Sequence, residues 1–277
     1  MRLSIREILP PICYRRLQKL WRREEQIHAP VFSGDYPSWR DAVAASSGYD
    51  QPAILAKVRE GALAVKAGKA AFERDSVTFT EPQFNWQVLA SLMSLAAASH
   101  GSLRVVDFGG SLGSLYFQHR RFLDPLSDLS WTVVEQPHFV RIGQAELADG
   151  RLSFAETVGD EASIRMPRTL ILSGVLQYLQ NPHDVLLSLL QNSWKAVILD
   201  RTAFVSTRSS DRLTVQRVPP EIYSATYPAW FFCPGSLEEH FQERFSETAR
   251  WICDDRYSLD QDQTSFEGRL FIAREST

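Results

Sequence analysis

From about residue 80 onwards, the apolar residues of this chain follow two different spacings in turn. Short and nearly continuous apolar runs predict buried strands near 103–108, 131–135, 151–155, 169–173 and 195–200. Segments with apolar residues at helical spacing lie between these runs. Strands that alternate with helices pair as parallel neighbours through right-handed crossovers. The pattern therefore predicts an α/β fold with a mainly parallel sheet.

Two further apolar runs, 249–253 and 268–273, come near the end of the chain and are separated by a polar loop. A loop of this kind favours an antiparallel hairpin. Together with the five earlier runs, the hairpin completes a sheet of seven strands.

The first part of the chain is organised differently. Helical spacing predicts one helix over 52–72, interrupted by Gly61 and Gly68, and another over 82–99 with Pro82 at an early position. We expect an N-terminal helical extension or cap over 1–79 and the main domain over 80–277. An insertion at about 203–235, rich in aromatic residues and prolines, is expected to form a lid over the substrate.

Composition limits the possible functions. The chain has 277 residues, 44% of them hydrophobic, which suits one elaborated domain, and its net charge of −3 gives no general attraction to nucleic acid. Three cysteines without metal-ligand spacing predict no metal site and favour a reducing, cytoplasmic location. Residues 1–27 are basic and partly amphipathic, so they could touch an anionic membrane surface, pack on their own domain or meet a partner in a homodimer.

A glycine-rich loop follows the strand at 103–108. The motif D-x-G-G-S-x-G contains Asp107, Gly109, Gly110, Ser111 and Gly113. Glycines allow positive φ and close approach of the backbone to a ligand, and helix amides beyond the loop would point toward it. A dinucleotide fingerprint places its glycines directly after the strand, whereas an acidic residue comes first here. This spacing favours S-adenosylmethionine (SAM) over NAD.

A second acidic residue, Glu135, ends the next predicted strand and is followed by Gln136. A carboxylate at this position can accept hydrogen bonds from both hydroxyls of a ribose. The alternative is that Glu135 is an ordinary charge before a helix that begins near Pro137. Its position one βα unit after the glycine loop favours the ribose role.

The segment from about Thr80 to the C-terminus resembles the class I SAM-dependent methyltransferases. More narrowly, it resembles a family of bacterial methyltransferases associated with surface-polysaccharide gene clusters, through the segments 107–113, 173–178 and 218–223. The resemblance implies a Rossmann-like seven-stranded sheet with helices on both faces, an antiparallel C-terminal hairpin, SAM as cofactor and a small-molecule or glycan acceptor, with O-methylation of a sugar as the leading reaction. Ser111 departs from the family pattern, because it stands where a glycine is expected.

Ligands of open α/β sheets bind at the carboxyl ends of the strands, so three later strand ends are informative. Glu156 could meet the adenine amino group or could be a solvated loop carboxylate. Ser173 and Gly174 are expected near the methionine part of the cofactor, where Gly174 would let backbone carbonyls approach. Gln177 and Tyr178 could face the methyl group or the acceptor, although Tyr178 also fits a half-buried core position.

His183, Tyr178 and Asp200 are the candidate catalytic residues. An imidazole could take a proton from a hydroxyl acceptor, but His183 also follows Asn181-Pro182 in a pattern typical of a helix N-terminus. Asp200 could orient the acceptor or accept its proton. Arg201 could bind a phosphate or carboxylate of the acceptor, or could form a local ion pair with Asp200.

Three aromatic residues of the insertion, Tyr223, Tyr227 and Trp230, are candidates for stacking on the acceptor, or they could simply cover the edge of the sheet. Two other functions fit parts of the chain. One is an NAD-dependent oxidoreductase that modifies sugars, and the other is a catalytically degenerate methyltransferase fold that serves as a binding or scaffold protein.

Overall fold

The computed structural model describes residues 31–47, 51–74, 77–159, 168–218, 225–255 and 257–274, and the side chains of 51–53 are not part of this description. Residues 1–27 and Tyr223 lie outside these ranges, so the predictions made for them stay predictions. Within these ranges, no helix is both long and apolar enough to cross a membrane.

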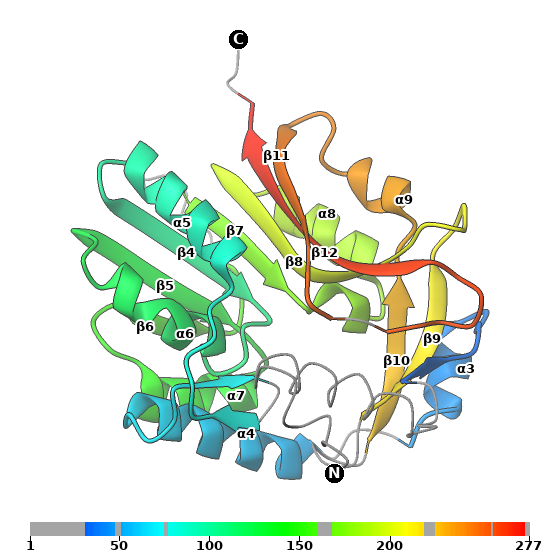
Figure 1. Ribbon diagram of the computed structural model, residues 1–277, viewed down its shortest axis with the longest axis horizontal. Helices are drawn as coiled ribbons and strands as arrows, with labels where there is room; N and C mark the ends of the chain where they lie inside the picture. The colour runs from blue at the N-terminus through cyan, green and yellow to red at the C-terminus, as the bar shows by residue number, and fades with distance from the viewer. Residues whose placement is uncertain are drawn as a thin grey trace, which may run out of the picture.

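A seven-stranded sheet forms the centre of the molecule (Figure 1). Its strands, in spatial order, are β11 (Phe245–Ile252), β12 (Thr264–Ala273), β8 (Ala196–Val205), β7 (Arg168–Ser173), β4 (Ser102–Phe108), β5 (Asp128–Val134) and β6 (Leu152–Ala155). The five strands from β8 to β6 are parallel, and β12 runs antiparallel to both of its neighbours. The predicted Rossmann-like methyltransferase sheet, with its antiparallel C-terminal hairpin, is confirmed.

Helices cover both faces of this sheet, as predicted. One hydrophobic core joins the sheet to α4 (Gln51–Lys66), α5 (Trp86–Ala98), α6 (Ser114–Leu123), α7 (Pro137–Ile142) and the π-helical turn at Gly143–Leu147. A second core joins the opposite face to the 3-10 turn at Leu176–Tyr178, α8 (Pro182–Leu190) and α9 (Pro234–Glu238). The sheet is therefore the middle layer of three.

Both predicted N-terminal helices exist, but their bounds differ from the prediction. α5 begins at Trp86 because Asn85 caps it, with the Asn85 side-chain oxygen accepting the Val88 N–H at 3.2 Å. Pro82 lies in the loop before the helix and does not start it. α4 ends at Lys66, and Gly68 then adopts a left-handed φ of +70°, which ends the helix before residue 72.

The insertion at 203–235 contains more regular structure than a loop. β8 continues to Val205, and β9 (Arg212–Arg217) and β10 (Thr226–Phe231) form a second sheet with β1 (Phe32–Ser33). β1 belongs to the N-terminal extension, so this three-stranded sheet joins two regions that the sequence suggested were separate. α3 (Trp39–Ala44) packs on β9 and β10, at the right of Figure 1. The described part of the insertion thus includes a folded layer, and its role as a substrate lid stays a prediction.

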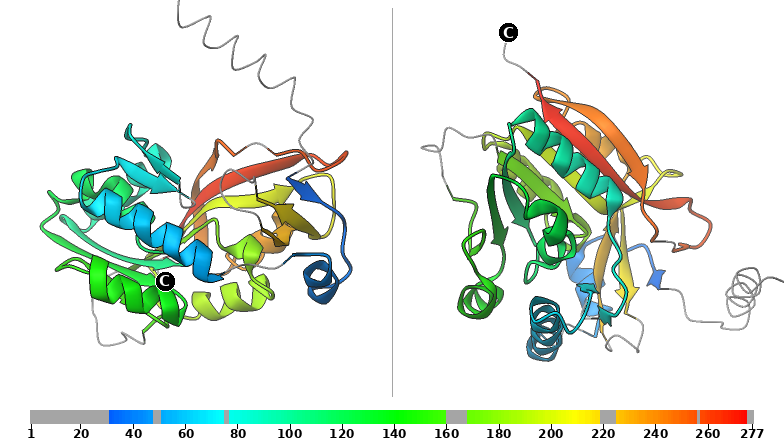
Figure 2. Two further views of the ribbon diagram at one scale, coloured as in Figure 1. Left: turned by 90° about the horizontal axis from the view of Figure 1, so that it is seen from below. Right: turned by 60° about the vertical axis from the view of Figure 1, so that its left-hand side comes forward.

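A small hairpin of β2 (Phe72–Arg74) and β3 (Val77–Phe79) follows α4. β2 contacts both α4 and α6. Figures 1 and 2 show α4 and the hairpin on the side of the molecule toward which β4, β5 and β7 point. α4 and the hairpin therefore lie at the carboxyl ends of the parallel strands, where α/β sheets bind their ligands.

Candidate cofactor site

The glycine-rich loop between β4 and α6 turns by means of left-handed backbone conformations. The φ angles of Gly109, Ser111 and Gly113 are +72°, +56° and +85°. A serine in this conformation costs of order 1 kcal/mol or more relative to glycine. Ser111 nevertheless adopts the left-handed conformation that glycine adopts more readily. Gly113 is the N-cap of α6 and has no side chain with which to cap that helix.

Asp107 lies directly behind the loop and is only 1% exposed. The indole N–H of Trp131 donates to its Oδ2 at 3.2 Å. A Cβ atom on Gly110 would lie 2.4 Å from Cγ of Asp107, so the loop can pack on this carboxyl group only because residue 110 is glycine. Asp107 therefore supports the loop from inside, while Gly110 brings the backbone into contact with it.

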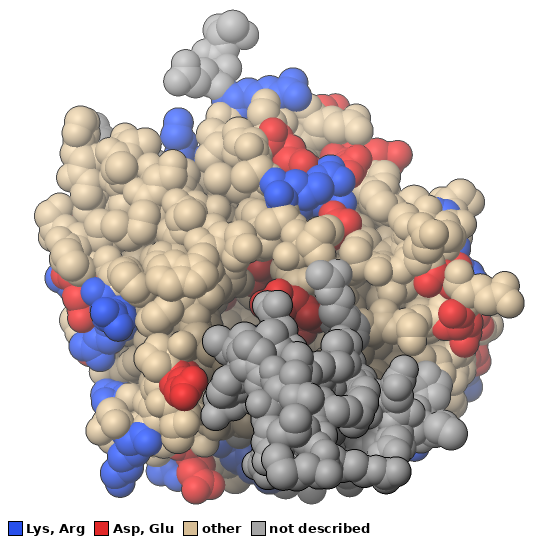
Figure 3. Space-filling view, viewed as in Figure 1, with Lys and Arg blue, Asp and Glu red and all other residues tan. Residues whose placement is uncertain are grey.

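The electrostatic surroundings of Asp107 are unusual for a buried acid. Burial raises its pKa to about 7, with the Trp131 hydrogen bond opposing the shift and the charges of Glu135 and Asp200 adding to it. The nearby charges that influence Asp107 are thus carboxylates. Acidic atoms are visible in a recess at the middle of the face in Figure 3, in the region where Figure 1 places the carboxyl ends of the central strands. A positively charged ligand would be attracted to this region.

Glu135 follows β5 and lies beside the glycine loop, where the sequence placed it. Its Oε2 accepts the Gln136 N–H at 2.7 Å, and the backbone of Ser111 also donates to this carboxylate. Burial raises the pKa of Glu135, and these two backbone hydrogen bonds oppose the rise. Gln136 itself is exposed and is the N-cap of α7. The carboxylate is therefore held at the junction of the loops that follow β4 and β5.

The next strand ends also carry predicted residues. Glu156 follows β6, the last strand of the sheet, and its side chain is exposed to solvent. Ser173 ends β7, and its hydroxyl donates to Oδ2 of Asp200 at 2.7 Å. Gly174 has a left-handed φ of +62° and donates its N–H to the Asp200 carbonyl at 2.9 Å. Ser173 and Gly174 thus join the ends of β7 and β8.

Asp200 is completely buried and accepts several hydrogen bonds. Asn85 Nδ2 donates to its Oδ2 at 3.0 Å, Trp251 Nε1 donates to its Oδ1 at 3.2 Å, and the Cys253 thiol lies 3.7 Å from the same Oδ1. With the Ser173 hydroxyl, these donors come from three separate segments. This arrangement makes Asp200 a junction between the start of α5, the end of β7 and the C-terminal hairpin.

Arg201 does not pair with Asp200, as one sequence-based alternative proposed, but with Asp255. Its Nε and Nη2 each donate to one carboxylate oxygen of Asp255 at 3.1 Å. Burial would raise the pKa of Asp255, but the adjacent Arg201 holds it below its usual value. The backbone of Arg201 is left-handed, with φ of +48°, at a bulge opposite Gly268. The Arg201 guanidinium is thus already paired with a carboxylate of the same chain.

Gln177 is 2% exposed and donates its amide N–H to the Arg201 carbonyl at 3.0 Å. Its Oε1 is buried and has no hydrogen-bond partner among the residues that the structure describes. A buried amide oxygen of this kind can accept a hydrogen bond from a ligand or a water molecule. Tyr178 donates its hydroxyl to Gln216 at 2.8 Å and meets the ring of Tyr227 edge-on.

Trp230 contributes to packing between the insertion and the N-terminal extension. Its indole N–H donates to the Leu179 carbonyl at 3.1 Å, and its ring stacks on Trp39 at a centroid distance of 6.4 Å. The structure therefore brings Tyr178, Tyr227 and Trp230 together around the 3-10 turn and β10. Their proposed contact with an acceptor stays a prediction.

His183 lies in the first turn of α8, in a polar cluster with Asp211 and His240. Its Nε2 is 2.6 Å from Oδ2 of Asp211, and its Nδ1 is 2.8 Å from Nε2 of His240. The hydrogen bond with Asp211 raises the pKa of His183. The N-cap residue of α8 is Asn181, which makes no side-chain capping bond. His183 therefore links the first turn of α8 to Asp211, just before β9, and to His240, just after α9.

Three residues that sequence reasoning did not assign to the site contribute to it. Trp131 is a diagonal cross-strand neighbour of Asp107, because Asp107 pairs with Val133 two residues further along β5. This relation follows only from the strand register. Asn85 stands just before a predicted helix, so a capping role could have been found from the sequence. Glu73 reaches the first residue of α6, and no local pattern indicates that contact.

Comparisons with known proteins give solved structures but no related sequences. No family model matches the chain, and no curated protein sequence matches it. The N-terminal domain of EvdMO1, solved in the presence of S-adenosylhomocysteine (SAH) and D-fucose, is 14% identical with a TM-score of 0.45, over 82% of this chain and 98% of that one. Magnesium protoporphyrin IX methyltransferase (ChlM) from Synechocystis PCC 6803, solved with SAM, is 16% identical with a TM-score of 0.42, over 69% and 79%.

A third similar structure is SAM-bound CalS10, an amino pentose methyltransferase from Micromonospora echinaspora, which is 10% identical with a TM-score of 0.41, over 69% of this chain and 92% of that one. At these identities and TM-scores, what those proteins bind or methylate does not transfer to this chain. The functional argument below starts from its own residues.

Proposed function

We propose that this protein is a SAM-dependent methyltransferase. The observation that carries the proposal is the set of carboxylates around the glycine loop. Asp107 lies behind the loop, Glu135 accepts a hydrogen bond from its Ser111, and Glu73 accepts the hydroxyl proton of Ser114 at 2.5 Å, where α6 begins. SAM carries a sulfonium and an ammonium, so this acidic surrounding suits its positive charges.

The same carboxylates argue against a dinucleotide. In dinucleotide-binding folds the pyrophosphate lies at the start of the helix after the glycine loop, where it meets backbone amides and the positive end of the helix. Here the Glu73 carboxylate contacts Ser114 at that place, and like charges close together repel strongly in a buried environment. A nicotinamide-dependent oxidoreductase is therefore the less favoured function.

Glu135 is the residue that would hold the ribose. Its carboxylate is anchored by the backbone N–H groups of Ser111 and Gln136, and carboxylate oxygens have acceptor capacity beyond these two bonds. The hydroxyls of a ribose could donate to that remaining capacity. The glycine loop would then support the rest of the nucleoside at van der Waals distance.

Methyl transfer requires mainly that the protein position the acceptor and the methyl group relative to each other. SAM supplies an activated methyl group: a lone pair of the acceptor forms a bond to the methyl carbon, the carbon–sulfur bond breaks with its electron pair passing to sulfur, and the acceptor loses its proton. The protein contributes by holding the two reactants in line and excluding water. Gln177, with its buried carbonyl oxygen beside Arg201, is a candidate for orienting an acceptor N–H or O–H group.

For the acceptor, we propose a neutral small molecule or glycan, with a sugar hydroxyl as the leading class. The pairing of Arg201 with Asp255 supports a neutral acceptor, because a phosphate or carboxylate would have to compete with Asp255 for the guanidinium. The resemblance of segments 107–113 and 173–178 to methyltransferases of polysaccharide gene clusters supports a sugar. A nucleic-acid acceptor is not expected at a net charge of −3. A cytoplasmic location and a homodimer stay predictions.

Calorimetric titration of the purified protein with SAM, SAH and NADH tests the proposal. We expect micromolar binding of SAM and SAH, and a loss of about 100-fold in Glu135→Ala, because two hydrogen bonds to a charged acceptor are removed. Glu243→Ala is the matched control, since Glu243 is exposed in the turn before β11. Binding of NADH instead would support the oxidoreductase, and binding of none of the three would support a scaffold protein.

A further inference from the structure

A row of three polar side chains connects α8 to α9. His183 lies in the first turn of α8, Asp211 lies just before β9, and His240 lies just after α9. Nε2 of His183 is 2.6 Å from Oδ2 of Asp211, and Nδ1 of His183 is 2.8 Å from Nε2 of His240. The ring of His183 also meets the buried ring of Phe232 edge-on, which fixes its orientation. Both ring nitrogens of His183 are therefore engaged.

Asp211 extends this row to the beginning of α9. Its Oδ1 accepts the backbone N–H of Cys233 at 2.8 Å and the hydroxyl of Ser236 at 2.7 Å. α9 has five residues, and a helix of this length is not stable by itself. Leu237 anchors its middle in the hydrophobic core. The polar contacts at its two ends, through Asp211 and His240, both lead to His183.

The distances limit how many protons the two histidines can hold. Hydrogen bonds keep the pKa of Asp211 below its usual value despite its burial, so its carboxylate only accepts and Nε2 of His183 donates to it. Between Nδ1 of His183 and Nε2 of His240 there is room for one hydrogen, because one nitrogen must donate and the other must accept. With both rings fully protonated, two N–H groups and two positive charges would face each other, and this contact could not form.

The surrounding charges decide which histidine is protonated first. The hydrogen bond with Asp211 raises the pKa of His183, and the charge of Asp184 on α8 adds to the rise. Burial and the charge of His183 lower the pKa of His240, although Glu239 and Asp211 oppose this shift. The other acid of α9, Glu238, pairs with arginines of the C-terminal hairpin. The first proton therefore belongs to His183, and His240 gains the second only at lower pH.

We propose that the contact between His183 and His240 is a pH-sensitive switch, which holds α9 on α8 near neutral pH and releases the end of α9 when His240 gains a proton. This inference does not depend on the proposed methyltransferase function. α9 follows β10 of the insertion, and α8 follows the 3-10 turn that contacts β10. Acidification thus loosens the insertion from the seven-stranded sheet at this point.

The two pKa shifts have opposite consequences for stability. The raised pKa of His183 gives a stabilisation that is complete below pH 6.5 and is lost as the pH rises through its folded-state pKa. The lowered pKa of His240 gives a stabilisation that is present above pH 6.5 and is lost as the pH falls through its folded-state pKa. The three side chains therefore stabilise the fold most between these two pKa values.

Nuclear magnetic resonance of the histidine side chains tests the order of protonation. Imidazole nitrogen shifts would be followed from about pH 4.5 to about pH 8.5, and we expect His183 to titrate above 6.5 and His240 below it. His183→Gln should move the pKa of His240 back toward 6.5, because the neighbouring positive charge is removed. His100→Gln is the matched control at an exposed histidine and should leave His240 unchanged. A wild-type pKa of 6.5 or higher for His240 would overturn the proposal.

Hydrogen exchange tests the release of α9 itself. A local measurement is needed because Asp107, with a pKa of about 7, titrates in the same pH range. From about pH 7 to about pH 5, we expect the protection factors of the amides at 236–241 to fall about tenfold in the wild type and less than about twofold in His240→Gln. The amides of β4 are the internal control and should keep their protection.

Equal loss of protection at 236–241 in the wild type and in His240→Gln, or no loss in the wild type, would contradict the release of α9. The side-chain titration and the wild-type exchange need no variant, so both remain decisive if His240→Gln does not fold.

Discussion

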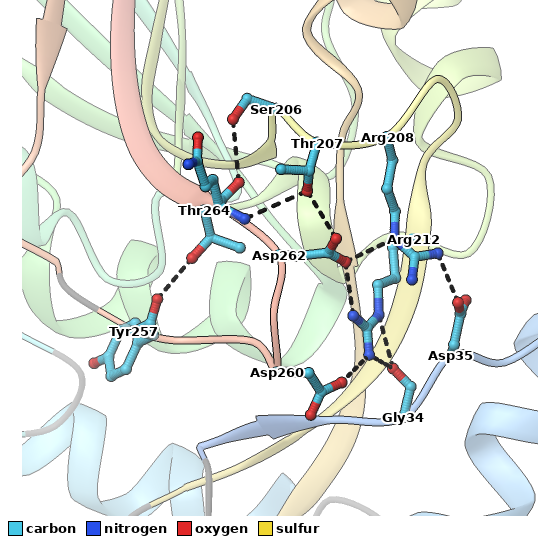
Figure 4. A network of polar contacts seen from close by, with 11 residues as sticks. Gly34, Asp35, Ser206, Thr207, Arg208, Arg212, Tyr257, Asp260, Asp262 and Thr264 are labelled. Atoms are coloured by element: carbon cyan, nitrogen blue, oxygen red, sulfur yellow. Dashed lines mark hydrogen bonds and ion pairs between the residues drawn. The ribbon is translucent and has the colours of Figure 1, made fainter.

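Two regions of this molecule bury charged side chains, and they differ in how those charges are paired. At the junction of the three-stranded sheet, Arg212 is 4% exposed and donates to Asp260 at 2.5 Å, to Asp262 at 2.7 Å and to the Gly34 carbonyl (Figure 4). At the carboxyl edge of the seven-stranded sheet, the charges that act on buried Asp107 are those of Glu135 and Asp200.

The pKa values of the two regions express this difference. Burial alone would raise the pKa of Asp262, but hydrogen bonds from Thr207, Arg212 and Arg208 lower it to about 2. Asp107 moves in the opposite direction, to about 7. Opposite charges next to one another stabilise the fold, whereas like charges next to one another favour a positive ligand. The first region is therefore interpreted as scaffold and the second as a binding site.

The largest effect on stability is expected from Arg212→Met. Removal of one partner from a buried ion pair leaves an uncompensated charge and costs about 3–5 kcal/mol of unfolding free energy. Urea denaturation would measure this loss, and Arg208→Met is the matched control, because Arg208 shares Asp262 but is 33% exposed and should cost only about 1 kcal/mol. SAM affinity of folded Arg212→Met should stay within about twofold of the wild type. A large change in affinity would contradict the separation of scaffold and site.

The second effect is the contribution of Asp107 to the pH dependence of the free energy of unfolding. Its pKa is raised from 3.8 to about 7 in the folded state, so the folded protein keeps a proton that the unfolded chain has already lost. The resulting stabilisation is complete below pH 3.8 and is lost as the pH rises to about 7, by up to about 4 kcal/mol. Asp107→Asn should flatten this slope, and Asp254→Asn, at an exposed position, should not.

Urea denaturation at several pH values between 4 and 8 would measure both variants. A wild-type slope that persists in Asp107→Asn would show that the proton resides elsewhere. The same protonation predicts that SAM binds more tightly as the pH rises through about 7, because a cation near Asp107 favours its ionised form.

A smaller effect is expected from Gly110→Ala. The added methyl group would lie 2.4 Å from Cγ of Asp107, and overpacking of this kind costs about 1–3 kcal/mol. Because the loop must move away from Asp107, we expect SAM affinity to fall as well. Gly150→Ala is the matched control, since a Cβ there meets nothing within 4 Å. Equal stability of the two variants would mean that the loop does not rest on Asp107.

The sheet and the glycine-rich turn could be predicted from the sequence, because both depend on local patterns. Apolar runs identified the strands, and the spacing of Asp107, Gly109 and Gly113 identified the turn. What the sequence could not predict depends on contacts between distant segments. Glu73 meets Ser114 across 41 positions, and Asp200 accepts a hydrogen bond from Asn85 across 115.

The second sheet shows the same limit. β1 pairs with β9, and neither is long enough or regular enough in sequence to predict that pairing. The predicted lid therefore contains strands held by a segment from the other end of the chain. Similarly, Arg201 pairs with Asp255 and not with its sequence neighbour Asp200. This pairing follows from the geometry of the C-terminal hairpin and cannot be derived from the residues next to Arg201.

The smallest effect is expected at His183, and it distinguishes a packing role from a catalytic one. In the structure His183 is held between Asp211 and His240, with hydrogen-bond distances of 2.6 and 2.8 Å, in a cluster that joins α8 to β9. His183→Gln should therefore lower stability by about 1 kcal/mol or less and change the rate of methyl transfer by less than about threefold, since it removes a partly exposed contact and no group that meets the acceptor. Asp211→Asn should give a similar loss of stability, because it weakens the same hydrogen bond. A rate that falls by a hundredfold or more in His183→Gln, but not in Asp211→Asn, would show that His183 acts as the base and would place the acceptor beside α8.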